Sequence, residues 1–394
     1  MSYNGDIMPV VTAKQAARFG RALLLRDVPV YAHYGITHRC DLTCKMCGIW
    51  RYGNEKEELT TEEIGVVAQK MANLGVAQVA LGGGEPFVRK DLPQIAEHFI
   101  SRGIRLRVLT NGVNVSREEL DAVLDAGVKD FSISLDSLSP ERFDHICEHE
   151  GSWEGAIRTM SYLAHRLHGS GGLGVLNCVV SDLNLEEIPD LVRFAREIGF
   201  AISLLPVELL AGPKDGVQNW EGRFIRHNPE LDLHSADKTV SSRTVAERVD
   251  RTYEKVIAMK REGWPVFNST PYLEASREYL KTGAFPAEGC DAGRLYFSIS
   301  PNGQFTICHR TQHNYKHILD PDFERYFNSD SYERIRMQEA GGCEGCMRAC
   351  WIDTSSIFRN FNGFFDTVKL AIRPNRHAPL PVDEVLKRAR HAPL

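Results

Sequence analysis

Between residues 30 and 206, short apolar segments alternate regularly with amphipathic segments. Apolar runs of about four to eight residues predict strands, and segments with one charged face predict helices. Strands that are separated by helices lie parallel, because each crossover returns the chain to the edge from which it started. The predicted strands are Tyr31–Thr37, Gln78–Leu81, Arg105–Leu109, Asp130–Leu135, Leu173–Val180 and Ala201–Leu205.

Helices are predicted between these strands, and several are followed by a glycine that suits a C-cap. The predicted helices are Thr61–Leu74, Leu92–Arg102, Arg117–Ala126, Trp153–His168 and Leu185–Ile198, and the capping glycines are Gly75, Gly103, Gly127 and Gly199. Six β/α units are fewer than the eight that close a barrel. The sequence therefore predicts an α/β fold that is either a partial (β/α)6 barrel of the TIM type, which we expect, or a doubly wound sheet.

The remainder of the chain predicts further segments around this core at 30–206. We expect an N-terminal extension at 1–29, connecting loop and helices at 207–284, a small α+β domain at 285–352, and a C-terminal helix and tail at 353–394. Within the α+β domain, two alternating runs flank Pro301-Asn302-Gly303. That arrangement is typical of a β-hairpin.

Charge and hydropathy exclude some classes of partner. The formal net charge is −5, from 47 basic and 52 acidic residues, whereas a nucleic-acid-binding protein would show a basic surface. No apolar run reaches the roughly 18–20 residues of a transmembrane helix. Residues 1–11 also lack the charged start and apolar centre of a signal peptide. We therefore expect a cytoplasmic protein with no nucleic-acid partner and no transmembrane segment.

Eight of the ten cysteines fall into two groups, and the first follows the first predicted strand. Its members are Cys40, Cys44 and Cys47. Thiolates are soft ligands that suit iron–sulfur clusters or zinc. Three of them can hold three corners of a [4Fe–4S] cluster and leave the fourth iron open to a ligand from outside the protein. A structural zinc ion would need a fourth ligand nearby, for which His38 is a candidate.

The Cys-x3-Cys-x2-Cys spacing resembles that of the radical S-adenosylmethionine (SAM) enzymes. Three further stretches strengthen the resemblance: LGGGEPFVRKDL at 81–92, LTNG at 109–112 and SISLDS at 132–137. Each follows or ends a predicted strand, where parallel α/β folds build their sites. The resemblance implies two cofactors, a SAM-binding [4Fe–4S] cluster and SAM itself.

The same resemblance implies a role for seven residues in binding SAM. Gly83, Gly84 and Glu85 would receive its amino group, Ser134 and Asp136 its ribose, and the backbone near Met46 its adenine, with Asn111 as a further contact. Each position has a simpler interpretation. The glycines suit a tight turn, Ser134 or Asp136 could cap the helix that begins near residue 140, and Asn-Gly is an ordinary turn.

Family chemistry then follows from these cofactors. SAM would chelate the open iron, a reduced cluster would cleave it, and the resulting 5′-deoxyadenosyl radical would take hydrogen from a substrate. The protein's part is to orient the reactants and exclude side reactions. The reductant would be a small electron carrier such as flavodoxin or ferredoxin.

The second cysteine group lies in the predicted α+β domain. It resembles the auxiliary-cluster extensions of radical SAM enzymes, the SPASM domain and its shorter twitch version. Five cysteines cannot fully ligate two cubanes, so we expect one auxiliary [4Fe–4S] cluster for electron transfer, with a zinc ribbon as the alternative. The expected ligands are Cys290, Cys308, Cys343 and Cys346, with Cys350 as the fifth candidate.

Three cysteines are weak candidates for a direct role in catalysis. Cys147, Cys178 or Cys350 could deliver a hydrogen atom to a substrate radical. Free cysteine is also among the most buried residue types, so a structural role is the simpler expectation for Cys147 and Cys178.

The substrate expected from the sequence is a small molecule that resembles a sugar or cyclitol, which hydrogen abstraction would oxidise. Only 30 residues precede the first predicted strand, too few for a leader-peptide-binding domain. The alternatives are a peptide-modifying enzyme, an epimerase and a carbon–carbon bond-forming enzyme. A zinc-binding protein without catalysis is a more distant possibility.

Overall fold

The computed structural model describes residues 13–208, 228–235, 241–285, 289–308, 315–343, 345–359, 380–381, 383–385 and 387. The start of the predicted N-terminal extension, much of the connecting loop and most of the C-terminal tail therefore lie outside the described residues. So does the side chain of Cys350.

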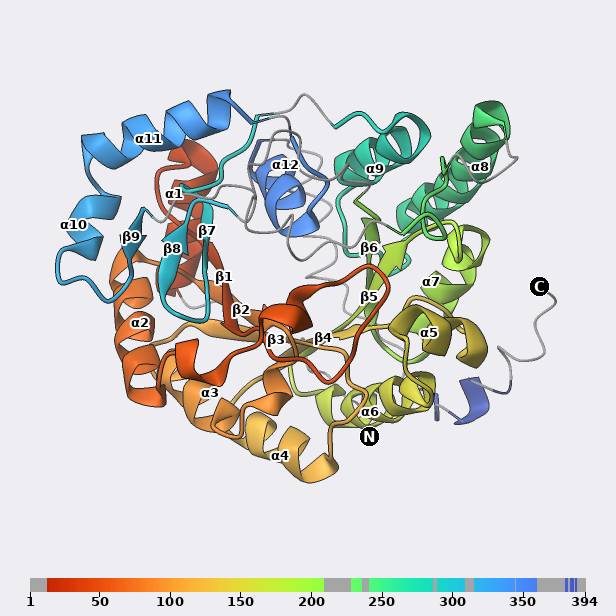
Figure 1. The fold of residues 1–394 in the computed structure, drawn as a ribbon, viewed down its shortest axis with the longest axis horizontal. Coiled ribbons are helices and arrows are strands. Elements are labelled where there is room, and N and C mark those ends of the chain that lie inside the picture. Colours follow the sequence, from red (N-terminus) through yellow and green to blue (C-terminus); the bar gives the residue numbers. More distant parts are fainter. Residues whose placement is uncertain are drawn as a thin grey trace.

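One sheet organises the fold, with strand order β6-β5-β4-β3-β2-β1-β7-β8-β9. The strands are β1 (Tyr31–Thr37), β2 (Gln78–Gly83), β3 (Arg105–Thr110), β4 (Asp130–Ser134), β5 (Leu173–Val180), β6 (Ala201–Pro206), β7 (Tyr296–Ile299), β8 (Gln304–Thr306) and β9 (Lys316–His317). Neighbours from β1 to β6 pair in parallel. The predicted α/β fold is thus confirmed, and the sheet curves as a partial barrel does (Figure 1).

Helices cover the outer face of this curved sheet (Figure 1). The crossover helices are α2 (Thr61–Leu74), α3 (Leu92–Ile100), α4 (Arg117–Asp125), α5 (Pro140–Cys147), α6 (Ser152–Leu167) and α7 (Ile188–Glu197). Local sequence sets their ends. For example, Thr60 and Glu63 form a capping box at the start of α2, and Gly75 ends it with a φ of 99°.

The remaining helices precede or follow the core. They are α1 (Ala13–Leu25), α8 (Ser242–Arg261), α9 (Thr270–Thr282), α10 (Phe323–Phe327), α11 (Asp330–Gly341) and α12 (Thr354–Arg359). Within the described ranges, none of the helices combines the length and the apolarity needed to cross a membrane.

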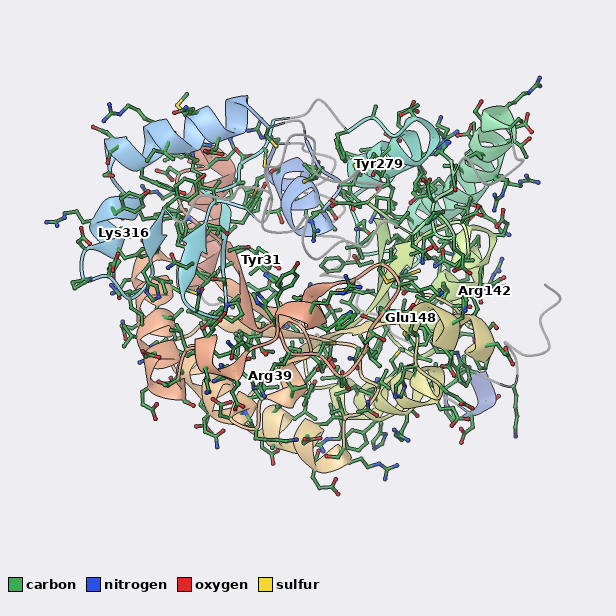
Figure 2. The ribbon with its side chains drawn as sticks, in the orientation of Figure 1. Tyr31, Arg39, Arg142, Glu148, Tyr279 and Lys316 are labelled. Carbon is green, nitrogen blue, oxygen red and sulfur yellow. The ribbon has the colours of Figure 1, made fainter. Side chains whose placement is uncertain are left out.

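The two faces of the sheet differ because side chains alternate along each strand. On the helix side, the Tyr34 ring meets the Phe99 ring of α3 at 6.4 Å between centroids, and Val108 is fully buried. The opposite face carries more polar residues, among them His33 and Arg107. Tyr31, at the start of β1, projects towards the space that the sheet encloses (Figure 2).

The predicted hairpin around Pro301 is confirmed, because β7 and β8 pair antiparallel. Its connection to the core could not be read from the sequence: β7 pairs in parallel with β1, from Tyr31 opposite Tyr296 to Tyr34 opposite Ile299. An aromatic cluster packs behind it, with the Phe305 ring 5.3 Å from the Phe323 ring. The segment that carries the second cysteine group therefore continues the sheet of the core.

Candidate functional site

The first three cysteines lie on the loop that follows β1. None of the three forms a disulfide, and all are partly buried. The Cys47 N–H donates to the Cys44 carbonyl at 3.0 Å, which makes a tight turn. Burial raises the pKa of Cys40, and a hydrogen bond with Cys147, followed by burial, raises the pKa of Cys44. Two thiols kept protonated in this way would deprotonate when a metal binds them.

Polar contacts tie this loop to the edge of the sheet. Asp41, between the first two cysteines, accepts hydrogen bonds from the Asn111 Nδ2 at 2.7 Å and the Asn114 Nδ2 at 2.9 Å. At the other end, the Lys45 N–H donates to the Ile146 carbonyl at 2.9 Å. The loop is therefore held both by the segment after β3 and by the end of α5.

The glycines after β2 let two chain segments approach each other closely. A Cβ on Gly83, whose φ is 115°, would lie 2.1 Å from the Thr37 carbonyl oxygen, and a Cβ on Gly84 would lie 2.0 Å from that of Arg39. The Gly84 N–H donates to Thr37 and the Glu85 N–H to Arg39, both at 2.8 Å. These glycines thus let the loop after β2 pack against the segment that leads to the cysteines. This packing is a second reason for glycine here, besides the expected approach of a ligand.

Glu85 has a buried carboxylate at the same edge. It accepts hydrogen bonds from the Thr110 hydroxyl at 2.8 Å, the Asn111 N–H at 2.7 Å and the Phe87 N–H at 3.1 Å. Burial raises the pKa of Glu85 to about 7. A buried carboxylate at this pKa is well suited to receive a cation, because an adjacent positive charge stabilises its ionised form.

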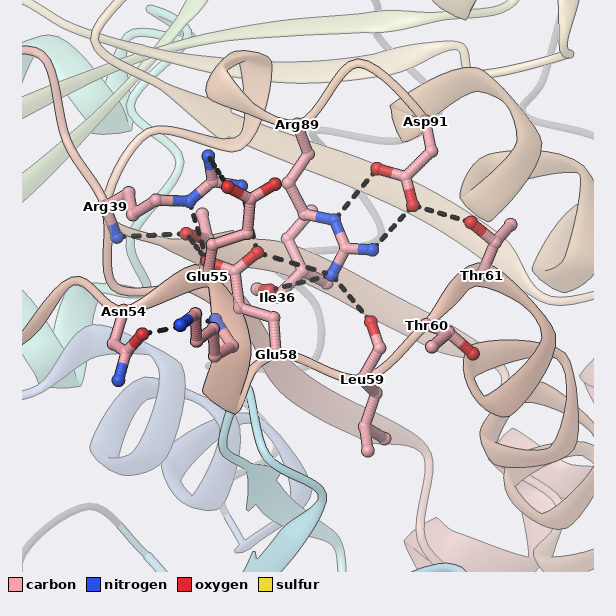
Figure 3. Close-up of polar contacts among 12 residues, drawn as sticks. Ile36, Arg39, Asn54, Glu55, Glu58, Leu59, Thr60, Thr61, Arg89 and Asp91 are labelled. Atoms are coloured by element: carbon pink, nitrogen blue, oxygen red, sulfur yellow. Dashed lines mark hydrogen bonds and ion pairs between the residues drawn. The ribbon is translucent and has the colours of Figure 1, made fainter.

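Sequence reasoning missed a buried ion network beneath the cysteine loop (Figure 3). The Arg39 guanidinium donates to both oxygens of Glu58, at 2.9 and 3.0 Å, and Thr37 also donates to this carboxylate. Arg89 donates to the carbonyls of Ile36 and Leu59 at 3.2 and 3.0 Å. The network joins the end of β1 to the segment before α2. Motif spacing could not have found it, although Arg39 directly precedes the cysteine motif and Arg89 lies within the stretch at 81–92.

The remaining predicted SAM contacts also lie at this edge. Asp136 is buried, its Oδ1 accepts the Val179 N–H at 2.6 Å, and burial raises the pKa of Asp136 to about 7. Ser134 ends β4 and is partly buried. Neither residue caps α5, because its N-cap is Ser139. Met46 is partly buried within the cysteine loop.

Asn111 does form the local turn that its sequence suggests. Its Oδ1 accepts the Val113 N–H at 2.8 Å. It also contacts Asp41, so a single side chain shapes the turn and anchors the cysteine loop.

The two isolated cysteines occupy different surroundings. Cys147, at the end of α5, is buried and lies beside Cys44. Cys178 is fully buried on β5, where the Asn184 Nδ2 donates to its sulfur at 3.6 Å. It alternates with Asn177, which pairs with Ser134, so Cys178 lies on the helix-covered face of the sheet.

The structure brings four cysteines of the second group close together. The pKa of Cys346 is raised mainly by burial and further by the charges of Glu208, Cys290 and Cys308. Burial also raises the pKa of Cys290, with a further contribution from Cys343. The Gly345 N–H donates to the Cys343 sulfur at 3.4 Å. These mutual charge effects indicate that the four thiols are neighbours, as a shared metal group would require.

The described residues contain no group of three or more His, Cys, Asp or Glu side chains that converge on one metal ion. A cubane does not need such convergence, because each cysteine binds a different iron. Three thiols on one short loop, next to a buried carboxylate, therefore fit a cluster that carries an additional ligand.

Comparison with known proteins identifies the family. The model of the radical SAM superfamily matches residues 34–195. The PqqA peptide cyclase of Bradyrhizobium diazoefficiens is 30% identical over 337 residues, which cover 81% of this chain and 79% of that protein. The chain belongs to the radical SAM superfamily. The family implies a [4Fe–4S] cluster and SAM as cofactors.

Other radical SAM relatives match shorter parts. The PqqA peptide cyclase of Rhizobium meliloti is 27% identical over 281 residues, 70% of this chain and 66% of that protein. The probable GTP 3′,8-cyclase of Methanocaldococcus jannaschii is 29% identical over 174 residues, 43% of this chain and 56% of that protein. The chain thus spans less than two thirds of the length of these two relatives.

Solved structures share the fold at low identity. Streptococcus suis SuiB bound to S-adenosylmethionine has a TM-score of 0.57 and 18% identity, and the match covers 84% of this chain and 77% of SuiB. The anSMEcpe protein with bound AdoMet has a TM-score of 0.54 and 14% identity, and the match covers 92% of this chain and all of that protein.

These relatives correct one expectation from the sequence. The expectation of a small sugar- or cyclitol-like substrate is wrong, because three relatives that align over 70–81% of this chain are PqqA peptide cyclases. The motif residues indicate the cofactor chemistry that the family shares. Substrate specificity depends on other side chains, which no motif specifies.

Proposed function

We propose that this chain is a peptide-modifying radical SAM enzyme that joins two side chains within a peptide. The observation that carries the proposal is the alignment with a PqqA peptide cyclase over 337 residues. That length exceeds the core at 30–206, so the likeness extends into the region of the second cysteine group. The SuiB fold offers further support, since a structure of SuiB holds its precursor peptide SuiA.

Residues of the first site have separate tasks in this proposal. Cys40, Cys44 and Cys47 hold the cluster, and Glu85 receives the amino group of SAM. Ser134, Asp136, Asn111 and the backbone at Met46, Gly83 and Gly84 complete the SAM site. When bound, the cluster and SAM supply the radical that removes a hydrogen atom from the substrate. The protein orients the peptide and keeps water away.

The second site would accept an electron. Joining two carbon atoms of a peptide breaks one C–H bond at each and forms one C–C bond. One hydrogen atom leaves on 5′-deoxyadenosine, and the other leaves as a proton and an electron. We propose that the second cysteine group would hold an auxiliary [4Fe–4S] cluster, which would supply a one-electron acceptor at this site. Its ligands would be Cys290, Cys308, Cys343 and Cys346, with Cys350 as the alternative, and a flavodoxin- or ferredoxin-like protein would exchange electrons with the enzyme.

The decisive experiment uses the anaerobically reconstituted full chain with SAM and a reductant. Short peptides encoded beside its gene are added singly, and 5′-deoxyadenosine and peptide mass are followed together. We expect one peptide to lose two hydrogen atoms per 5′-deoxyadenosine formed. Stimulation of 5′-deoxyadenosine formation by a small alcohol, with every peptide unchanged, would overturn the proposal. Zinc in place of iron at the second site would overturn only the auxiliary-cluster assignment.

A further inference from the structure

The inner face of the barrel carries a cation, Arg107, that forms no ion pair with any carboxylate in the described part of the chain. Along β3, Leu106 and Val108 are buried on the helix-covered face. Arg105 and Arg107 therefore lie on the opposite face, towards the enclosed space, because side chains alternate along a strand. A cation in such a place costs free energy unless a partner offsets it.

Strand register places Arg107 in one row with residues from neighbouring strands. Arg107 is paired with Ala80 of β2 on one side and with Asp130 of β4 on the other. Ala80 is paired in turn with His33 of β1. His33 and Arg107 thus lie at the same level, two strands apart, with the small alanine side chain between them.

The one carboxylate in this row already has a partner. Asp130 accepts the Arg105 Nε at 2.5 Å and the Arg105 Nη2 at 2.6 Å. Arg105 also donates from Nη2 to the Gly171 carbonyl at 3.3 Å. The two hydrogen bonds form the bidentate arrangement that a guanidinium and a carboxylate prefer. Both oxygens of Asp130 are therefore hydrogen-bonded to Arg105.

Among the residues that the structure describes, Arg107 has an aromatic neighbour but no ion-pair partner. Its guanidinium lies over the Phe267 ring, 4.9 Å from the centroid, and its buried Nε has no hydrogen-bond partner. No carboxylate among the described residues lies within ion-pair distance of it. Burial lowers the pKa of Arg107, and the charge of Asp130 opposes this only in part. A bound anion would offset the remaining cost of the charged form.

The surroundings favour an anion over a second cation. Burial, together with the positive charge of Arg348, lowers the pKa of His33 to about 4. His33 is thus neutral at pH 7, and Arg348, in the segment of the second cysteine group, is itself ion-paired with Glu208 at 3.5 Å. A carboxylate placed between the neutral His33 and Arg107 would meet a favourable potential that comes from Arg107.

We propose that Arg107 binds a carboxylate of the peptide substrate, the side chain of a glutamate or aspartate, inside the barrel. The proposal rests on the proposed peptide-modifying function and names a substrate feature for it. Arg107 precedes Thr110 by three residues, which is about 10 Å along a strand. The carboxylate would therefore lie below the edge where Glu85 and the cysteine loop hold SAM, at a depth that exposes neighbouring substrate atoms to the radical.

The test compares two isosteric probes, N-acetylglutamate N-methylamide and N-acetylglutamine N-methylamide. Calorimetric titration into the reconstituted enzyme with SAM bound should show roughly tenfold or tighter binding of the carboxylate, since a hydrogen bond to a charged group is worth more than a neutral one. Arg107→Gln should remove the preference and Arg107→Lys should retain part of it. Arg193→Gln, on the exposed surface of α7, should leave it unchanged.

Two binding results, and one result on SAM affinity, would overturn the proposal. One is equal or undetectable binding of both probes to the wild-type enzyme, and the other is a carboxylate preference that survives in Arg107→Gln. Weaker SAM binding in Arg107→Gln would assign the arginine to the carboxylate of SAM instead. Iron content and circular dichroism check that each variant folds. If Arg107→Gln does not fold, the carboxylate preference is measured in Arg107→Lys instead. SAM cleavage in the same preparation tests the proposed function separately.

Discussion

The Asp41 carboxylate accepts a hydrogen bond from the Asn111 amide at 2.7 Å and thereby joins the cysteine loop to the end of β3. The two residues are 70 positions apart in the chain. One belongs to the cysteine motif and the other to the Asn-Gly turn. Two of the sequence motifs are therefore parts of one structural unit.

Asp41→Ala should weaken retention of the first cluster, because it removes both anchoring hydrogen bonds. Asn114→Ala removes only the 2.9 Å bond to Asp41 and should have the smaller effect. Each bond to a charged group is worth about 1.5–3 kcal/mol at most. Iron and sulfide content after desalting gives the ranking. Equal iron in both variants and the wild type would show that the anchor is dispensable.

Cys44→Ala should abolish formation of 5′-deoxyadenosine, since two thiolates cannot hold the cluster in place. The matched control is Cys178→Ala, which alters a buried thiol on the helix-covered face and should retain both iron and SAM cleavage. Anaerobic incubation with SAM and reductant, followed by chromatography, measures the product. Normal product from Cys44→Ala would refute the ligand assignment.

Cys343→Ala should distinguish the roles of the two proposed clusters. SAM cleavage should continue, while formation of modified peptide should fall by at least tenfold and iron content should drop by about half. The comparison is made on the same preparations, with 5′-deoxyadenosine and peptide mass as the two readouts. A variant that makes normal amounts of modified peptide would remove the second site from turnover.

SAM affinity should increase with pH up to about pH 7. Burial raises the pKa of Glu85 from 4.5 to about 7, and only the ionised carboxylate attracts an ammonium group. Below pH 7 the affinity should fall by up to tenfold per pH unit. Glu85→Gln should bind SAM weakly and remove this dependence. Asp136→Asn is the necessary companion variant, because burial also raises the pKa of Asp136 to about 7.

The same pKa shift affects stability in the opposite sense. Between pH 4.5 and pH 7 the folded chain keeps a proton on Glu85 that the unfolded chain has released. Folding stability of the metal-free protein should therefore decrease as pH rises through this window and then level off. Denaturant midpoints across the window check the sign, and a wild-type profile that matches Glu85→Gln would contradict it.

Glu58→Ala should destabilise the fold by about 3 kcal/mol or more, because it leaves Arg39 without its buried partner. Only 4% of the Glu58 side chain is exposed. Arg21→Ala is the matched control: its ion pair with Asp27 is 58% and 33% exposed and should be worth less than about 1 kcal/mol. Denaturant midpoints of the metal-free variants measure both. Similar midpoints would mean that the network in Figure 3 contributes no special stability.

Local sequence patterns were sufficient to predict the secondary-structure elements and the cofactor chemistry. Strand and helix periods, capping residues such as Gly75 and the hairpin at Pro301 depend on neighbours within a few positions, so they can be read locally. The spacing of Cys40, Cys44 and Cys47 likewise lies within a single loop.

Tertiary structure decided the contacts between elements. The pairing of β7 with β1, the Arg39–Glu58 network and the row that holds His33 and Arg107 all depend on strand register and on segments far apart in the chain. No local pattern specifies these, because register is fixed by packing of the whole sheet. For the same reason the sequence indicated the reaction type, while the side chains that would select a substrate became visible only in the folded barrel.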